Sequence, residues 1–142
     1  MRSRDSLSPP EALVLTMVLI AVADGGMTDR EIGVMSGQVQ TLPIFYDFTT
    51  DSLIEVTDAA ISLLGEGDGL IRAGRLIRAA LDLRLRETAY ALACEVIAAE
   101  RSKAPQSLDM LEFVRKELHL DQLIAAAIER GVRARHQYAQ PI

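Results

Sequence analysis

Carboxylates and a hydroxyl gather at one predicted turn near the start of the chain. Asp24 ends a long apolar segment, two glycines follow, and Asp29 and Glu31 come shortly after. The hydroxyl of Thr28 lies beside them. A tight turn can bring these groups together, where like charges are costly unless a cation or a basic side chain neutralises them. Oxygen-only ligands favour a hard cation such as Ca²⁺ or Mg²⁺, so this turn is a candidate metal site.

The spacing of these acids differs from that of a helix–loop–helix calcium loop. Counting from Asp24, the sixth position is Asp29 where that loop has glycine, and the twelfth is Met35 where it has glutamate. A cation here needs further ligands from elsewhere in the chain, and we expect them from Glu100 or Glu95 in the fifth predicted helix. The candidate metal ligands are Asp24, Asp29, Glu31 and Glu100.

The same acids also have a purely structural interpretation. Asp29 and Glu31 suit a helix N-terminus because the helix dipole stabilises negative charge there. Glu31 lies three residues after Thr28, which is the spacing of a capping box. Asp24 can accept hydrogen bonds from loop amides. The residues alone leave metal binding and helix capping open as alternatives.

A second charged feature is a row of arginines in the fourth predicted helix. Arg72, Arg75 and Arg78 are spaced three apart, so they form one stripe on a helix. Arg84 and Arg86 follow. Such a stripe can bind an oxyanion, an acidic partner or anionic lipid headgroups. It is more typical of a solvated face whose arginines pair with nearby acids.

Signs of catalysis are few. His119 and His136 are the only histidines, and neither has a Cys, Ser or His neighbour in a recognisable spacing. The sequence contains no glycine-rich phosphate loop, paired-cysteine motif or nucleophile elbow. Cys94, the only cysteine, lies in an apolar run, which predicts a small core residue and fits a reducing compartment. We predict a protein that is not an enzyme.

The charge of the chain is acidic overall and unevenly distributed. The net charge of −5 argues against a general nucleic-acid binder, which needs a clustered basic surface. Residues 1–68 contain eleven acids and three bases, whereas residues 69–142 contain nine acids and twelve bases. This asymmetry bears on the choice of partners rather than on the fold.

The apolar pattern that positions these residues predicts an all-α protein. No segment alternates with the period of two that is typical of a strand. The first apolar segment is too short to span a bilayer, and we expect a buried helix there rather than a signal peptide. Proline, glycine and capping residues divide the chain into seven predicted helices. Their approximate ranges are 11–23, 28–41, 50–64, 70–81, 85–99, 107–119 and 121–135.

The length of 142 residues suits a single domain with one core, ordered from about residue 9 to residue 135. Residues 23–28 and 99–107 each join two predicted helices and are weak copies of one another, so the two hairpins could pack about a pseudo-twofold axis. Three of the six aromatic residues, Phe45, Tyr46 and Phe48, fall in one loop. Such a cluster most often plugs the end of a bundle, and a partner-binding knob is the alternative.

Residues 21–31, Ala-Val-Ala-Asp-Gly-Gly-Met-Thr-Asp-Arg-Glu, resemble the TerB-like family of tellurite-resistance proteins. That family carries an Ala-Asp-Gly turn after an apolar helix and an acid seven positions on, which are Asp24 and Glu31 here. Residues 90–120 resemble the family's second hairpin, and the likeness extends over about residues 10–135. The resemblance implies a compact bundle of about seven helices whose two hairpins form an acidic patch that binds divalent cations.

The resemblance also implies a cytoplasmic stress-response component connected with membrane-bound metal transporters or sensors. Related domains are attached to DnaJ-like co-chaperones. This sequence departs from the pattern at the second turn, where Glu100 and Arg101 replace Asp-Gly and Ser107 stands seven positions on.

The function expected from the resemblance and the acidic turn is that of a non-enzymatic module. It would bind a divalent cation and act through protein partners, without binding nucleic acid or inserting into a membrane. The alternative is a pure protein-interaction scaffold without metal.

Overall fold

The computed structural model describes residues 6–100 and 104–139, and all regular secondary structure in these ranges is helical, as predicted. In chain order the elements are α1 (Pro9–Val22), α2 (Asp29–Thr41), the short 3₁₀ helix η1 (Pro43–Phe45), α3 (Thr50–Leu64), α4 (Gly69–Ala80), α5 (Leu83–Ala98), α6 (Pro105–Glu117) and α7 (Gln122–Arg135).

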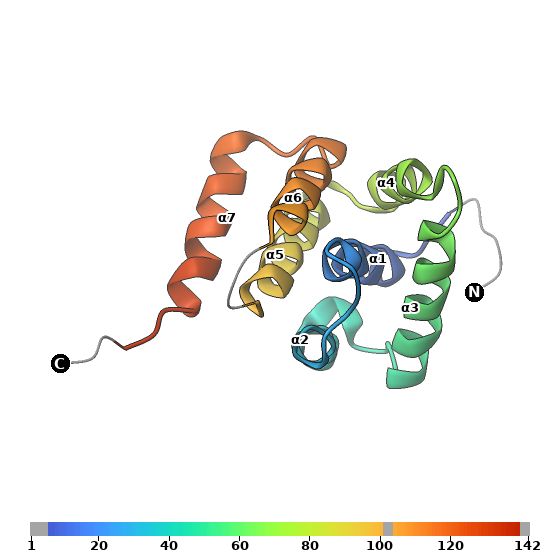
Figure 1. Ribbon diagram of the computed structural model, residues 1–142, viewed down its shortest axis with the longest axis horizontal. Helices are drawn as coiled ribbons and strands as arrows, with labels where there is room; N and C mark the ends of the chain where they lie inside the picture. The colour runs from blue at the N-terminus through green and yellow to red at the C-terminus, as the bar shows by residue number, and fades with distance from the viewer. Residues whose placement is uncertain (1–5, 101–103, 140–142) are drawn as a thin grey trace.

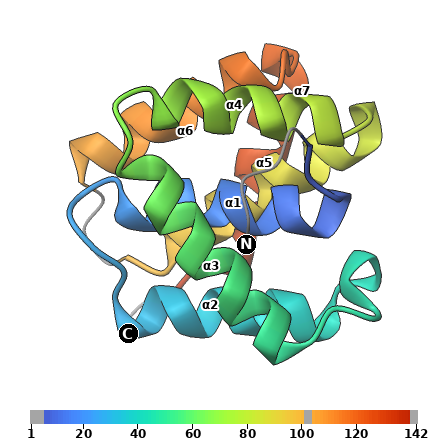
Figure 2. The same cartoon turned by 90° about the vertical axis from the view of Figure 1, so that its right-hand side faces the viewer.

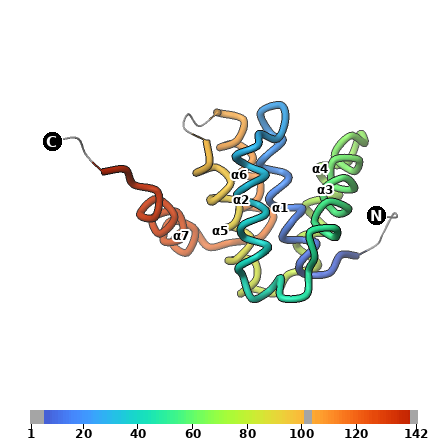
Figure 3. Tube along the Cα trace, turned by 90° about the horizontal axis from the view of Figure 1, so that it is seen from below, coloured from blue at the N-terminus to red at the C-terminus, as the bar shows by residue number. Residues whose placement is uncertain are grey.

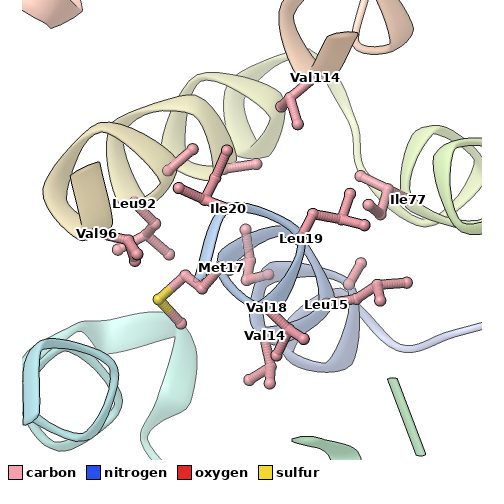
Figure 4. Packing of buried hydrophobic residues seen from close by; sticks show 14 of the residues in the cluster. Val14, Leu15, Met17, Val18, Leu19, Ile20, Ile77, Leu92, Val96 and Val114 are labelled. Carbon is pink, nitrogen blue, oxygen red and sulfur yellow. The ribbon is translucent and has the colours of Figure 1, made fainter. Parts of the chain in front are cut away.

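Helix α1 is the centre of the molecule. Every residue from Ala12 to Ala21 is buried, which is the burial expected for a helix that is apolar all round. Its one internal polar side chain, Thr16, donates its hydroxyl to the Ala12 carbonyl at 2.8 Å and so leaves no unpaired donor. Figure 4 shows side chains of α1 packed against others of the core, among them Leu92 and Ile77. The prediction of a buried first helix is confirmed.

The other helices surround α1. Helices α3 and α4 pack on one side of it, α5 and α6 lie on the other, and α2 closes the bundle between α3 and α5 (Figures 1 and 2). Helix α7 packs chiefly against α5 and stands at the edge of the bundle (Figures 1 and 3). No helix in the described ranges is both long and apolar enough to cross a bilayer.

Side-chain caps account for most of the helix starts. Ser8 accepts from the Glu11 amide and completes a capping box before the two prolines at the start of α1. Thr49 caps α3, Asp82 caps α5 and Asp121 caps α7 through side-chain oxygens that accept backbone amides. Each of these bonds satisfies a donor that the first turn of a helix otherwise leaves unpaired.

The predicted start of the sixth helix is wrong. We expected it to begin at Ser107, the first residue of the predicted range 107–119, but α6 begins at Pro105 with Ala104 as its cap residue. Proline suits a first helical position because its fixed φ is already helical and its missing N–H would have no partner there. Ser107 therefore falls inside the first turn. It is buried there, and its amide donates a hydrogen bond to the Ala104 carbonyl at 3.1 Å.

The aromatic loop divides into a buried part and an exposed part. Phe45 is buried in the core and its ring centroid lies 5.6 Å from that of Phe48. Phe45 belongs to the core and Phe48 packs against it, which fits the predicted plug for these two rings. Tyr46 points away, with 87% of its surface exposed.

Candidate functional site

The acidic turn between α1 and α2 separates its carboxylates instead of collecting them. Gly25 has φ of 135°, a conformation that favours glycine, and this reversal lets the chain leave α1 and enter α2 within a few residues. Asp24 in the turn and Asp29 in the first position of α2 are both exposed. Glu31, two residues further, is buried with 1% of its surface exposed.

Glu31 is held in place by the predicted capping box. Its amide donates to the Thr28 hydroxyl oxygen at 3.1 Å, and its carboxylate Oε1 accepts from the Thr28 amide at 2.8 Å and from the Thr28 hydroxyl at 3.2 Å. Both bonds that the carboxylate accepts end on Oε1. Oε2 is therefore available to a group outside α2.

That group is Glu100, which follows the end of α5. Its amide donates a hydrogen bond to the Ile97 carbonyl at 3.0 Å. The carboxyl groups of Glu31 and Glu100 lie within hydrogen-bonding reach of one another. Glu100 Oε1 is fully enclosed and has no hydrogen-bond partner among the described residues.

The enclosure of this carboxyl pair has an electrostatic consequence. Burial raises the pKa of Glu31 above its ordinary value, and the neighbouring Glu100 raises that pKa further. The bonds from Thr28 act in the opposite direction because they stabilise the ionised form. Two ionised carboxylates cannot hydrogen-bond each other, so the pair requires a proton or a cation between its oxygens.

The structure thus brings together two of the four predicted metal ligands, Glu31 and Glu100. Asp24 and Asp29 lie in solvent, and no hydrogen bond or ion pair among the described residues connects either of them to the pair. Within residues 6–100 and 104–139, no group of three or more His, Cys, Asp or Glu side chains is arranged around a common metal position.

Glu95, the other acid considered as a ligand, faces a different helix. It is buried, and its carboxylate lies 3.3 Å from Arg135 Nε and 2.7 Å from His136 Nε2 at the end of α7. The sequence signal for this contact is an acid within an otherwise apolar run, since a buried carboxylate requires a partner. The sequence does not indicate that the partner lies forty residues away on α7.

A second polar contact between α5 and α7 was not predicted. The Tyr90 hydroxyl donates to Glu129 Oε2 at 2.5 Å. Burial, with a further contribution from Glu129, raises the pKa of Tyr90. Nearby, burial raises the pKa of the Cys94 thiol to about 12, so this thiol is protonated and weakly nucleophilic, as expected of a core residue.

The arginine stripe of α4 is largely paired within the molecule. Arg72 pairs with Glu66, and Arg78 pairs with Glu117 of α6 at 2.9 Å. These pairs favour the interpretation of the stripe as a solvated face rather than as an oxyanion site. The guanidinium of Arg86 donates to the carbonyls of Arg78 and Leu81 at 3.0 Å each, and to that of Leu118 at 3.5 Å.

Comparison with models of protein families, with curated proteins and with solved structures finds no match to this chain. The resemblance to the TerB-like family therefore stays a prediction.

Proposed function

We propose that this protein is a non-enzymatic helical module that binds a divalent cation between Glu31 and Glu100 and acts through protein partners. The observation that supports the proposal is the enclosed carboxyl pair, in which Glu100 Oε1 has no described donor and the pKa of Glu31 is raised. An enclosed acceptor without a donor is uncommon in folded proteins and requires an explanation. A cation that replaces a shared proton supplies one.

The chemistry of the two side chains fits a hard cation. Both ligands are carboxylates, the preferred ligands of Ca²⁺ and Mg²⁺, and Mg²⁺ commonly keeps several water ligands beside one or two carboxylates. Glu31, at the start of α2, and Glu100, after the end of α5, would both be ligands of the ion. Binding would join the first helical hairpin to the second.

The cellular role that we propose rests on the resemblance stated above. It is that of a cytoplasmic component of a tellurite-type stress response, with membrane-bound metal transporter components as candidate partners. The single buried cysteine fits a reducing compartment.

The direct test is a titration of the full chain with Ca²⁺, Mg²⁺ and Mn²⁺, read by thermal unfolding and by amide chemical shifts. A ligand at a hundredfold excess over its Kd stabilises by about 2.7 kcal/mol, which raises Tm by roughly 5–10 °C in a domain of this size. Glu31→Gln and Glu100→Gln should abolish the rise. Asp24→Asn and Asp29→Asn are the matched controls and should retain it.

The pH dependence provides a second arm of the test. The raised pKa of Glu31 means that the folded state binds its proton more tightly than the unfolded chain does. Without metal, stability should therefore fall as the pH rises from the ordinary value of 4.5 through the raised pKa. Glu31→Gln keeps a capping-box residue and should flatten this slope. A cation must displace the proton, so its affinity should increase over the same pH range.

The outcomes that would contradict the proposal are clear. If millimolar metal changes neither Tm nor the amide shifts of residues 28–31 in the unaltered chain, the cation is excluded. If Asp24→Asn or Asp29→Asn abolishes the response while Glu100→Gln does not, the site lies in the exposed turn and not at the pair.

A protein-interaction scaffold without metal is the second candidate. It is favoured by apolar side chains on the outer surface, since Tyr46 is exposed and Ile54 and Ile61 lie exposed seven residues apart on α3. A partner that binds equally with and without metal, and that is lost on Tyr46→Ala or Ile54→Glu, would support this function instead.

A further inference from the structure

Helix α3 presents two large apolar side chains to solvent on its outer face. Ile54 is 55% exposed and Ile61 is 45% exposed. They lie seven residues apart, which is two helical turns or about 10 Å, so they share one side of the helix. The residues of α3 that are buried instead are Leu53, Val56, Ala60 and Leu63.

This outer face belongs to the surface of the molecule. Figure 2 shows α3 lying across the molecule in front of α1, against which it packs. The solvent face of a helix normally carries polar and charged side chains. A single exposed isoleucine is ordinary, but two isoleucines at a spacing of two turns form a stripe that a partner helix can cover.

The same face of α3 carries acids and no bases. Asp58 lies four residues after Ile54 and three before Ile61, and Asp51 lies three residues before Ile54. Both aspartates are exposed, and none of the ion pairs formed among the described residues involves either of them. Their charges are therefore available to a basic partner.

The negative charge extends beyond α3 along the chain. Residues 31–71 contain seven acids, and they contain no lysine, arginine or histidine. The acids are Glu31, Asp47, Asp51, Glu55, Asp58, Glu66 and Asp68. A surface with one sign of charge attracts partners of the opposite sign over a distance.

The bases of the helices packed on α3 are engaged elsewhere. Helix α1 has no base, and Arg72 of α4 pairs with Glu66 in the loop before that helix. Arg78 of α4 pairs with Glu117 of α6. Arg75 lies beside Arg78 in a pocket that residues at the start of α5 also line. The aspartates of the outer face of α3 are consequently not neutralised by α4.

We infer that the outer face of α3 binds a basic amphipathic helix of a partner protein. The apolar side chains of that helix lie against Ile54 and Ile61. Its lysine or arginine side chains lie beside Asp51 and Asp58, which attract a basic helix and repel an acidic one. Anionic membrane surfaces are repelled for the same reason. The inference rests on the proposed action through protein partners and does not depend on cation binding at the carboxyl pair.

The test uses a synthetic peptide of about 18 residues, or about five helical turns, with leucine at every third or fourth position and lysine at the positions between. Its titration into the full chain, followed by calorimetry and by chemical shifts, should give saturable one-to-one binding with shifts in residues 51–61. A second peptide with glutamate in place of every lysine should bind at least about tenfold more weakly. Binding of the lysine peptide should weaken as the salt concentration rises.

Two matched pairs of variants separate this face from general attraction to an acidic protein. Asp58→Lys should weaken binding of the lysine peptide about tenfold, whereas Asp109→Lys on α6, which changes the net charge equally, should leave it within about threefold. Ile61→Ser should weaken binding about tenfold, whereas Ile124→Ser on α7, at the opposite edge of the bundle (Figure 1), should leave it within about twofold. All four positions are exposed, so these variants should fold.

The inference is overturned if the lysine peptide does not bind saturably, if the two peptides bind equally, or if the control variants lose as much affinity as the variants of the α3 face. A dimer of the unaltered chain that Ile61→Ser dissociates, seen by sedimentation without peptide, would assign the face to a second copy instead. The variants of α3 should retain the rise in Tm with metal. A failure of this inference is therefore distinguishable from a failure of cation binding.

Discussion

Helices α1 and α7 have the same length of 14 residues but are held in the molecule in different ways. In α1 ten consecutive residues are buried, from Ala12 to Ala21. In α7 only Ala125 and Val132 are buried. Helix α7 combines this limited apolar packing with polar contacts to α5, from Tyr90 to Glu129 and from Glu95 to the end of α7.

The difference shows two ways of placing a helix. Burial is non-directional, so it drives α1 to the centre but leaves its orientation to the packing of side chains around it. Hydrogen bonds and ion pairs contribute less free energy each but are directional. The polar contacts of α7 select its partners on α5, and a groove of about 840 Å³ lies between the ends of α5, α6 and α7.

The largest effect should come from the centre of α1. Leu19→Ala removes a fully buried side chain, and the transfer and cavity terms together should lower the free energy of unfolding by about 2–5 kcal/mol. Urea unfolding measures this loss. The control is Leu123→Ala on α7, which is 77% exposed and should change stability by less than about 0.5 kcal/mol. Equal losses in the two variants would show that Leu123 is packed as closely as Leu19, which its exposure contradicts.

A smaller and more local effect is expected at the Tyr90–Glu129 contact. Tyr90→Phe removes the hydroxyl and leaves the Glu129 carboxylate without its donor, which should cost about 1–2 kcal/mol. Because the contact joins only α5 and α7, hydrogen exchange should accelerate in α7 and remain slow in α1. Uniform acceleration across both helices would instead indicate that α7 and the bundle unfold as one unit.

The contact of Glu95 with the C-terminal end of α7 should contribute less to the free energy of unfolding. Glu95→Gln removes the charge that faces Arg135 and His136, and we expect a loss of at most about 1 kcal/mol because the Arg135 side chain is 67% exposed and screened by solvent. The loss should appear as fraying of the last turn of α7 in its amide exchange. Arg130→Gln is the control, since that side chain lies on the exposed surface of the same helix. A loss as large as that of Leu19→Ala would make this contact a principal determinant of the fold.

The smallest signal should be the reactivity of Cys94 beneath α7. Because burial raises its pKa to about 12, only a minute fraction of the thiol is ionised at pH 8, and labelling should be slow. As long as the pH is below that pKa, the labelling rate should rise about tenfold with each unit of increase in pH, since the thiolate is the nucleophile. Tyr90→Phe should increase the rate by loosening α7. Fast labelling at pH 8 in the unaltered chain would show that α7 is detached most of the time.

The sequence predicted the parts of the fold that local chemistry determines. The all-round apolar pattern of α1 leaves it no solvent-facing side, so its burial follows from composition alone. The capping box at Thr28 follows from hydrogen bonds over three residues. For the same reason Glu31 was predicted correctly as part of a capping box.

The features that the sequence did not predict depend on contacts between distant segments of the chain. Glu95 lies in α5 and Glu100 lies just after its end, five residues further along the chain. Glu95 contacts the end of α7 and Glu100 contacts α2, because these two helices pack against different parts of α5. Nothing in the spacing of Glu129 or His136 indicates that α7 lies along α5. The start of α6 was missed for a local reason, because the helix-initiating preference of Pro105 outweighed the capping preference of Ser107.

The double role of Glu31 makes the start of α2 an indicator of what occupies the carboxyl pair. The same carboxylate closes the first turn of the helix through Thr28 and faces Glu100. A proton on Glu31 weakens the bonds that it accepts, whereas a cation keeps the carboxylate ionised and preserves them. Occupancy of the pair should therefore change the length of a helix, and far-ultraviolet circular dichroism could follow it without any label.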